Sequence, residues 1–275
     1  MNQPSNDNHL DCNYESTNHD NLTQKKSEAK RLSNRRHRVK IRTFADGHRA
    51  GIITYSPYRM SAGRADKDPE KARDYMEESL ARTKSSIEVL SRHNFLSQMV
   101  TATIGDRRDR LPSELLSDFA TFCNRQGKKL SIGKVLAVAG RGSNGKVHIH
   151  AGVSDGRCWG KETQEKWDEY MNRKGFVSVT GSHRIFVSDI TDWNTVAGYL
   201  CKSIDEFDPC ELVGFKRYRT RQIEVPPVYT RTVWATCPYE AYKELGIDVI
   251  PREIISPNGN LYCLKWDTRF DDKAY

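Results

Sequence analysis

The sequence predicts an α+β protein in which helices pack on an antiparallel sheet, preceded by a disordered basic arm. Two observations support this class. Between residues 68 and 204, helix-like and strand-like segments alternate, and after one initial helix their order is β-α-β-β-α-β-β-α. The positive charge is concentrated near the N-terminus. Residues 25–42 contain nine basic residues and one acidic residue, so their net charge of +8 equals that of the whole chain of 275 residues.

The predicted basic arm covers residues 1–45. Residues 1–24 are almost entirely polar and cannot bury enough apolar surface to fold. The basic run that follows suits phosphate binding without sequence preference, or else serves as a solvated tail that aids solubility. Residues 46–93 are expected to form a linker and a first helix.

Each predicted element depends on a local signal. Helices are expected where apolar residues recur at three- and four-residue intervals after a capping residue or a proline, as at Pro69 and Pro112. Strands are expected where β-branched and other apolar residues cluster or alternate with polar ones. The predicted helices span 68–92, 112–126, 161–174 and 191–204, and the predicted strands span 95–104, 134–139, 147–153, 176–179 and 184–187.

A glycine-rich loop joins two of these strands. Gly140, Gly142 and Gly145 match the dinucleotide-binding pattern, and residues 140–146 match most of a Walker A loop. Both kinds of phosphate site require a helix directly after the loop, whereas the alternating sequence that follows here predicts a strand. Asn144 and Gly145 between two strands are instead typical of a tight hairpin, so we expect a turn rather than a nucleotide site.

Composition bears on the compartment and on membrane association. The seven cysteines are scattered without a C-x-x-C pair, which argues against a disulfide framework and against a thiolate zinc site. Free thiols of this kind are typical of a reducing cytoplasm. No apolar run is long enough to span a membrane, and the polar N-terminus has no signal-peptide core, so we expect a cytoplasmic protein without a membrane partner.

Two histidines lie on the predicted strand 147–153. His148 and His150 are separated by Ile149, so the alternation of a strand places both imidazoles on one face and the isoleucine on the other. Neutral imidazoles held together on a rigid strand make half of a site for a divalent metal ion. On its own, however, an H-x-H pattern more often reflects two solvent-facing histidines.

A tyrosine and a lysine share one face of the last predicted helix, because Tyr199 and Lys202 are three residues apart. A tyrosine oxygen can attack phosphorus and form a covalent phosphotyrosine if a metal ion or an ammonium group stabilises the added negative charge. Seen alone, the Y-x-x-K pattern is more often a surface pair.

In combination, these patterns resemble the HUH endonucleases, and in particular the single-tyrosine rolling-circle replication initiators of phages and plasmids. The histidine pair matches the family's H-hydrophobe-H motif, and the segment from Tyr199 to Lys202 matches its Y-x-x-K motif. Residues 100–103 are similar to the family's first motif, and residues 214–219 are similar to the basic segment that closes many such domains. The resemblance covers about residues 95–226.

The resemblance implies an activity. A divalent ion, Mg²⁺ or Mn²⁺, would be held by His148 and His150 and would polarise a phosphate of single-stranded or hairpin origin DNA. Tyr199 would attack this phosphate, leaving a covalent 5′-phosphotyrosine and a 3′-OH primer, while Lys202 would offset the developing charge. Basic residues with an interleaved aromatic would contact the DNA, namely Lys216, Arg217, Tyr218, Arg219 and Arg221.

The resemblance also implies a fold and partners. An HUH endonuclease domain with a ferredoxin-like or RRM-like sheet would span residues 94–226, and residues 227–275 would form a C-terminal accessory segment. A helicase motor has no motif in the sequence, so a host helicase and a host polymerase would act with the protein in the cytoplasm of a bacterial cell.

Two departures from the family pattern concern the chemistry. Many members carry an acidic third metal ligand on the strand before the histidines, but residues 135–139 contain no carboxylate. Asp155, Asp189 or water would have to complete the metal's ligands. The helix carries no second tyrosine on the face of Tyr199, so the route by which the covalent intermediate is resolved stays open, with activation of a water by Glu206 as one possibility.

Other classes of protein share parts of this pattern. A mobilisation relaxase or a Y1 transposase would carry the same motifs, but relaxases usually add a third histidine beside the pair and Y1 transposases lack a basic arm. The nearest further histidine, His183, lies outside the motif. A non-catalytic DNA-binding protein would keep the histidines as structural residues. A metallohydrolase would need further ligands at motif spacing, which the sequence does not supply.

Overall fold

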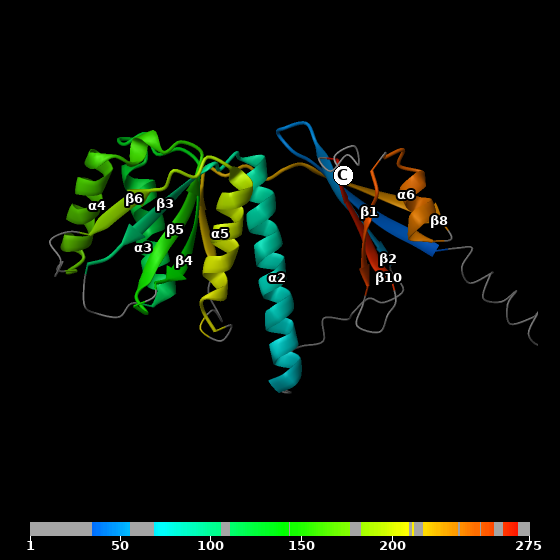
Figure 1. Ribbon diagram of the computed structural model, residues 1–275, viewed down its shortest axis with the longest axis horizontal. Coiled ribbons are helices and arrows are strands. Elements are labelled where there is room, and N and C mark those ends of the chain that lie inside the picture. The colour runs from blue at the N-terminus through cyan, green and yellow to red at the C-terminus, as the bar shows by residue number, and fades with distance from the viewer. Residues whose placement is uncertain are drawn as a thin grey trace, which may run out of the picture. The chain divides into compact units, whose positions relative to one another are not determined.

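The computed structural model describes residues 35–55, 69–105, 111–142, 144–176, 183–208, 211, 217–235, 237–247, 249–255 and 261–268. It divides into two compact units. The terminal unit comprises Met1–Arg42, His48–Arg59 and Val228–Tyr275, and the central unit comprises Thr43–Gly47 and Met60–Pro227. Each unit combines one five-stranded sheet with at least one helix, so the predicted α+β class is confirmed (Figure 1).

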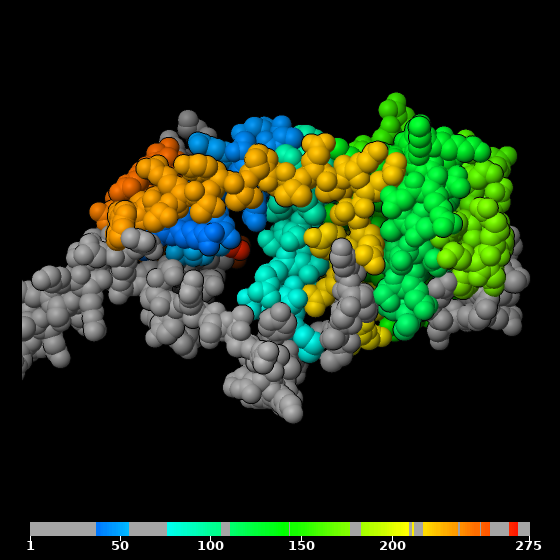
Figure 2. Space-filling view, turned by 180° about the vertical axis from the view of Figure 1, so that it is seen from behind, coloured from blue at the N-terminus to red at the C-terminus, as the bar shows by residue number. Residues whose placement is uncertain are grey.

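The terminal unit has the strand order β8-β1-β2-β10-β9. Its elements are β1 (Arg35–Thr43), β2 (Arg49–Tyr55), β8 (Val228–Ala235), α6 (Pro238–Lys243), β9 (Arg252–Ile255) and β10 (Leu261–Asp267). Strand β1 pairs with β8, and the two lie side by side at the surface, blue and orange in Figure 2. One face of the sheet packs on α6 through a small core that includes Val39, Ile53, Val233, Leu264 and Trp266.

The predicted disordered arm is wrong over residues 35–43, which form β1. The physical reason is an alternation that the density of charge conceals: His37 and Val39 are buried against the core, whereas Arg38 and Lys40 are exposed. Residues 1–34, which make up the rest of the predicted arm, lie outside the described residues.

The central unit has an antiparallel sheet with the strand order β6-β3-β5-β4-β7. Its strands are β3 (Gln98–Thr103), β4 (Val135–Arg141), β5 (Val147–Val153), β6 (Arg184–Val187) and β7 (Tyr218–Arg221). Its helices are α2 (Pro69–His93), α3 (Pro112–Gln126), the 3₁₀ helix η1 (Arg157–Trp159), α4 (Lys161–Arg173) and α5 (Trp193–Asp205). These elements confirm the predicted helices and most predicted strands, but residues 177–179 of one predicted strand lie outside the described residues.

The turn between β4 and β5 is the predicted hairpin. Gly145 has φ +76°, a conformation that favours glycine, and the amide of Gly142 donates to the carbonyl of Lys146 across the turn. Strands β4 and β5 then pair in register from Gly140 opposite His148 to Val135 opposite Val153. The hairpin therefore fixes which residues of β4 lie beside the histidines.

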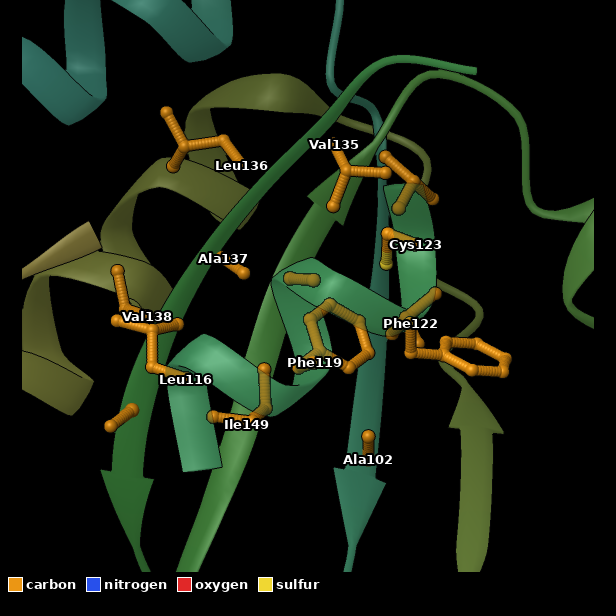
Figure 3. Close-up of a cluster of buried hydrophobic side chains, with 14 of the residues drawn as sticks. Ala102, Leu116, Phe119, Phe122, Cys123, Val135, Leu136, Ala137, Val138 and Ile149 are labelled. Atoms are coloured by element: carbon orange, nitrogen blue, oxygen red, sulfur yellow. The ribbon is translucent and has the colours of Figure 1, made fainter. Parts of the chain in front are cut away.

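The core of the central unit lies between the sheet and α3. Figure 3 shows Ala102, Ala137 and Ile149 of three strands pointing toward Leu116 and Phe119 of α3. Aromatic rings extend this core toward α4, and the ring centroids of Phe122 and Trp167 are 5.2 Å apart in an edge-on arrangement. These contacts make the strand that carries the histidines a rigid element.

Removing an aromatic ring from this core is expected to lower stability strongly. Phe122 is fully buried, so Phe122→Ala should reduce the free energy of unfolding by about 3–5 kcal/mol. The matched control is Phe186→Ala, because the Phe186 ring on β6 is 50% exposed, and it should cost less than about 1 kcal/mol. Chemical denaturation of both variants measures the difference, and equal losses would contradict the assignment of Phe122 to the core.

Within the described residues, no helix has the length and apolar character that crossing a membrane requires.

Candidate functional site

The predicted histidine pair lies on β5, the middle strand of the central sheet. Ile149 is fully buried, whereas His148 and His150 are partly exposed on the opposite face. Helix α5 covers this same face, since a Cβ atom on Gly152, which shares the face of the histidines, would lie 2.9 Å from Cγ1 of Val196 on α5. The sheet therefore presents both imidazoles on the side that carries α5.

The two imidazoles converge. Their Nε2 atoms are 2.7 Å apart, and the rings are nearly perpendicular, with centroids separated by 4.4 Å. On the neighbouring strand β3, the Thr101 hydroxyl lies 3.0 Å from Nδ1 of His150, which orients that ring. Two nitrogen ligands on an octahedral ion at about 2.1 Å would be about 3 Å apart, so the pair fits one divalent ion with little movement.

Burial keeps both imidazoles in the neutral form that binds metals. It lowers the pKa of His150 to about 4, and the repulsion that two protonated rings would experience acts in the same direction. Burial also lowers the pKa of His148, although the Glu206 carboxylate and the Lys146 backbone partly oppose this shift. At neutral pH, neither histidine needs to lose a proton before it can coordinate an ion.

Glu206 supplies a carboxylate beside the pair. It caps the C-terminus of α5, and its Oε2 accepts a hydrogen bond of 2.6 Å from the amide of Arg141 at the end of β4. A Cβ atom added to Gly140 would lie 3.0 Å from Nε2 of His148 and 3.2 Å from Oε2 of Glu206. The imidazole and the carboxylate therefore flank the same point above Gly140. No group of three or more His, Cys, Asp or Glu side chains surrounds a common metal position in the part of the chain that the structure describes.

The structure does not support Asp155 or Asp189 as a third ligand. Asp155 lies past the far end of β5 from His148, and its carboxylate accepts hydrogen bonds from the backbone and side chain of Arg157. The residue of β6 that pairs with Thr101, and is therefore level with His150, is Phe186. Asp189 lies beyond the end of β6 and so further from the histidines. Asp155 is separated from the pair by the length of β5 itself, and Asp189 is separated by the register of β6, which the sequence alone does not reveal.

Tyr199 and Lys202 lie on an exposed flank of α5. Tyr199 is 47% exposed, and the buried residues of the helix, among them Val196 and Leu200, pack on the sheet. The opposite flank of α5 faces α2, because Cys201 and Asp205 contact Lys84. The tyrosine flank is the one that also carries Glu206, two helical turns later, which in turn lies beside His148.

The predicted DNA-binding segment divides into residues with different surroundings. Arg217 donates to the hydroxyls of Ser79 and Thr83 on α2, and burial lowers its pKa. Arg221 donates to the carbonyl of Ile132, so both guanidinium groups stabilise the central unit itself. Tyr218 and Arg219 are partly exposed, and Lys216 lies outside the described residues.

Gly140 forms the floor of the site, and a side chain there is expected to disrupt it. The added Cβ atom of Gly140→Ala would lie 2.7 Å from Cδ2 of His150, so the imidazole would have to turn away. We expect at least tenfold weaker Mn²⁺ binding by calorimetry with a similar melting temperature. Gly133→Ala, whose Cβ atom would lie 3.6 Å from the Ser154 hydroxyl, is the control, and equal affinities of the two variants would contradict the assignment.

Phe186 is a site residue that the sequence did not indicate. It is paired with Thr101, and its exposed ring lies on the same face of the sheet as His150. An exposed aromatic ring is a surface on which a nucleobase can stack. A short strand rich in apolar residues is ordinarily assigned to a core, which is why sequence reasoning missed it.

No family model, curated protein or solved structure matches the chain.

Proposed function

We propose that the protein is a single-tyrosine endonuclease that nicks single-stranded origin DNA and so initiates rolling-circle replication. The observation that supports this function best is the placement of α5 on the face of the central sheet that carries the histidine pair. The helix that carries Tyr199 therefore lies on the same side of the sheet as the two imidazoles and the Glu206 carboxylate. Phosphoryl transfer to tyrosine needs a hydroxyl nucleophile and groups that stabilise the added negative charge, and these residues can supply both.

In the proposed reaction, each of these residues has a distinct role. When bound, Mg²⁺ or Mn²⁺ would be held by His148 and His150 and would polarise the scissile phosphate. The Tyr199 oxygen attacks phosphorus, the bond from phosphorus to the 3′ oxygen breaks, and the 3′ oxygen takes up a proton. The phenolic proton of Tyr199 passes to water, and the ammonium of Lys202 offsets the negative charge that develops. The products are a 5′-phosphotyrosine and a 3′-OH that a host polymerase can extend.

The remaining parts of the proposal follow from the same activity. The proposed substrate is single-stranded or hairpin origin DNA in a bacterial cytoplasm, with strand separation supplied by a host helicase. Phe186 and Arg184, which lie on the face of the histidines and are exposed, would contact the DNA near the scissile phosphate. A relaxase or a Y1 transposase would use the same chemistry on a different DNA.

The test uses circular single-stranded DNA that carries a randomised segment. Incubation with the protein and Mn²⁺ should give linear DNA attached covalently to protein, detected as a complex that survives SDS and disappears on protease digestion. Sequencing of the attached ends then identifies the nick site. DNA that is bound but never cleaved or attached would favour the non-catalytic DNA-binding protein instead.

A further inference from the structure

The terminal unit has a second surface of interest, the face of its sheet opposite α6, here called the outer face. Because side chains alternate along a strand, the residues of β1 and β8 that do not contact α6 lie on this face. On β1 these are Arg38, Lys40 and Arg42, and their partners on β8 are Thr232, Thr230 and Val228. None of these six residues contributes to the small core under α6.

The outer face is strongly basic. Arg38 and Lys40 are exposed and Arg42 is partly exposed, and the face continues across the sheet to Lys265 on β10 and its partner Arg252 on β9, both exposed. Among the described strand residues, alternation places one carboxylate on this face, Asp267 at the end of β10. Five cations against one acid on a single sheet face favour a polyanionic partner.

An exposed tryptophan lies on the same face. Trp234 on β8 is 55% exposed, and it shares the outer face with Thr232 and Thr230. The other described tryptophan of this unit, Trp266, is 4% exposed and packs over Gly51 in the core. Trp234, by contrast, leaves more than half of its surface to solvent. A large exposed ring beside cations is the arrangement that stacks on nucleobases.

We propose that the outer face of the terminal unit binds single-stranded DNA. Cations at alternate positions of β1 recur about every 6.7 Å, close to the separation of successive phosphates in an extended single strand. Trp234 can stack on a base only where that base is not already stacked and paired, which is the case in a single strand.

The width of the sheet argues against a duplex. Five strands spaced about 4.8 Å apart make a face about 19 Å wide, whereas the major groove of B-DNA is about 12 Å wide. The face therefore cannot enter a groove as a two-stranded ribbon does. The choice of DNA over RNA rests on the function proposed above, but the charge and the tryptophan do not depend on it.

The experiment measures binding of the full chain to fluorescein-labelled dT₂₀ by anisotropy, in EDTA, over a series of salt concentrations. Replacing Arg38, Lys40 and Arg42 together by glutamine should weaken binding at least tenfold at low salt and reduce the slope of log affinity against log salt by about 2. The matched control replaces Lys128, Lys129 and Lys161, exposed lysines of the central unit, by glutamine and should change affinity less than about twofold.

Trp234→Ala gives an independent readout. It should weaken binding about tenfold without changing the salt slope, and Trp234→Phe should restore most of the affinity. If circular dichroism shows that the triple variant does not fold, Lys40→Gln alone should lower the slope by about 0.7. Face variants that bind dT₂₀ like the control triple, or a larger loss for rU₂₀ or a 20-base-pair duplex than for dT₂₀, would overturn the proposal.

These outcomes are distinguishable from failure of the proposed nicking activity. Binding in EDTA requires no cleavage, so loss of affinity on the outer face would stand even if no covalent adduct forms. Conversely, a covalent adduct with unchanged affinity of the face variants would leave the endonuclease intact and remove the outer face from DNA binding.

Discussion

Tyr199→Phe is expected to abolish nicking and to leave no detectable covalent protein–DNA adduct, because the substitution removes the oxygen that attacks phosphorus. The ring stays, and Tyr199 is half exposed on α5, so stability should change by less than about 0.5 kcal/mol. Binding of the uncleaved DNA should stay within about twofold of the unsubstituted protein. Denaturing gels measure the adduct, and anisotropy measures binding.

The control for this substitution is Tyr229→Phe, which removes the same atom from an exposed tyrosine of the terminal unit. It should nick DNA at the full rate. An adduct that persists in Tyr199→Phe would show that another residue attacks, and the assignment of the nucleophile would fail even if the protein proves to be a nuclease.

His148→Ala is expected to slow cleavage about a thousandfold or more, and EDTA should do the same to the unsubstituted protein. The reason is that Lewis-acid stabilisation of a phosphoryl transition state contributes several kcal/mol. His150→Ala should behave alike, because the two Nε2 atoms are 2.7 Å apart and would share one ion. Calorimetric titration with Mn²⁺ should show binding to the unsubstituted protein and none to either variant.

His48→Ala provides the comparison, since His48 is exposed and contacts Thr268 in the terminal unit. It should retain Mn²⁺ binding and cleavage. Full cleavage by His148→Ala, or metal binding that survives the loss of both histidines, would show that the pair is structural, as two hydrogen-bonded strand histidines would be.

The elements of the central unit follow from local signals, and the sequence predicts them well. Proline at the start of α3, Asp192 accepting from the Thr195 amide at the start of α5, and the turn at Gly145 each act over a few residues. The shared face of His148 and His150 follows from the period of a strand alone. Such features need no knowledge of the rest of the fold.

The surroundings of the histidines could not be predicted in the same way. Glu206 lies beside His148 only because Gly152 allows α5 to approach β5 closely, which is a tertiary contact. Asp189 lies away from the histidines because of the register of β6, which is also a tertiary feature, whereas Asp155 lies beyond the far end of β5. Likewise Arg217 and Arg221 resemble DNA contacts in sequence, but their partners on α2 and at Ile132 are distant along the chain.

The sheet of the terminal unit could not be predicted from the sequence for a related reason. Its sheet pairs residues 35–55 with residues 228–267, and no local signal links two segments so far apart. The nine basic residues of the run 25–42 also obscured the alternation of Val39 with Arg38 and Lys40. A high density of like charge is compatible with a strand when the charges all lie on one of its faces.

The terminal unit is built from two segments of the chain that are separated by the central unit, and this affects its folding during translation. Strands β1 and β2 leave the ribosome early, but β8 and β10, which flank them in the sheet, follow only after the central unit has been translated. At elongation rates of about 5–20 residues per second, the nascent β1–β2 hairpin waits roughly 10–40 s for its neighbours. Throughout this interval the edges of the hairpin lack partners, and we expect the cations of β1 to disfavour its pairing with another nascent chain.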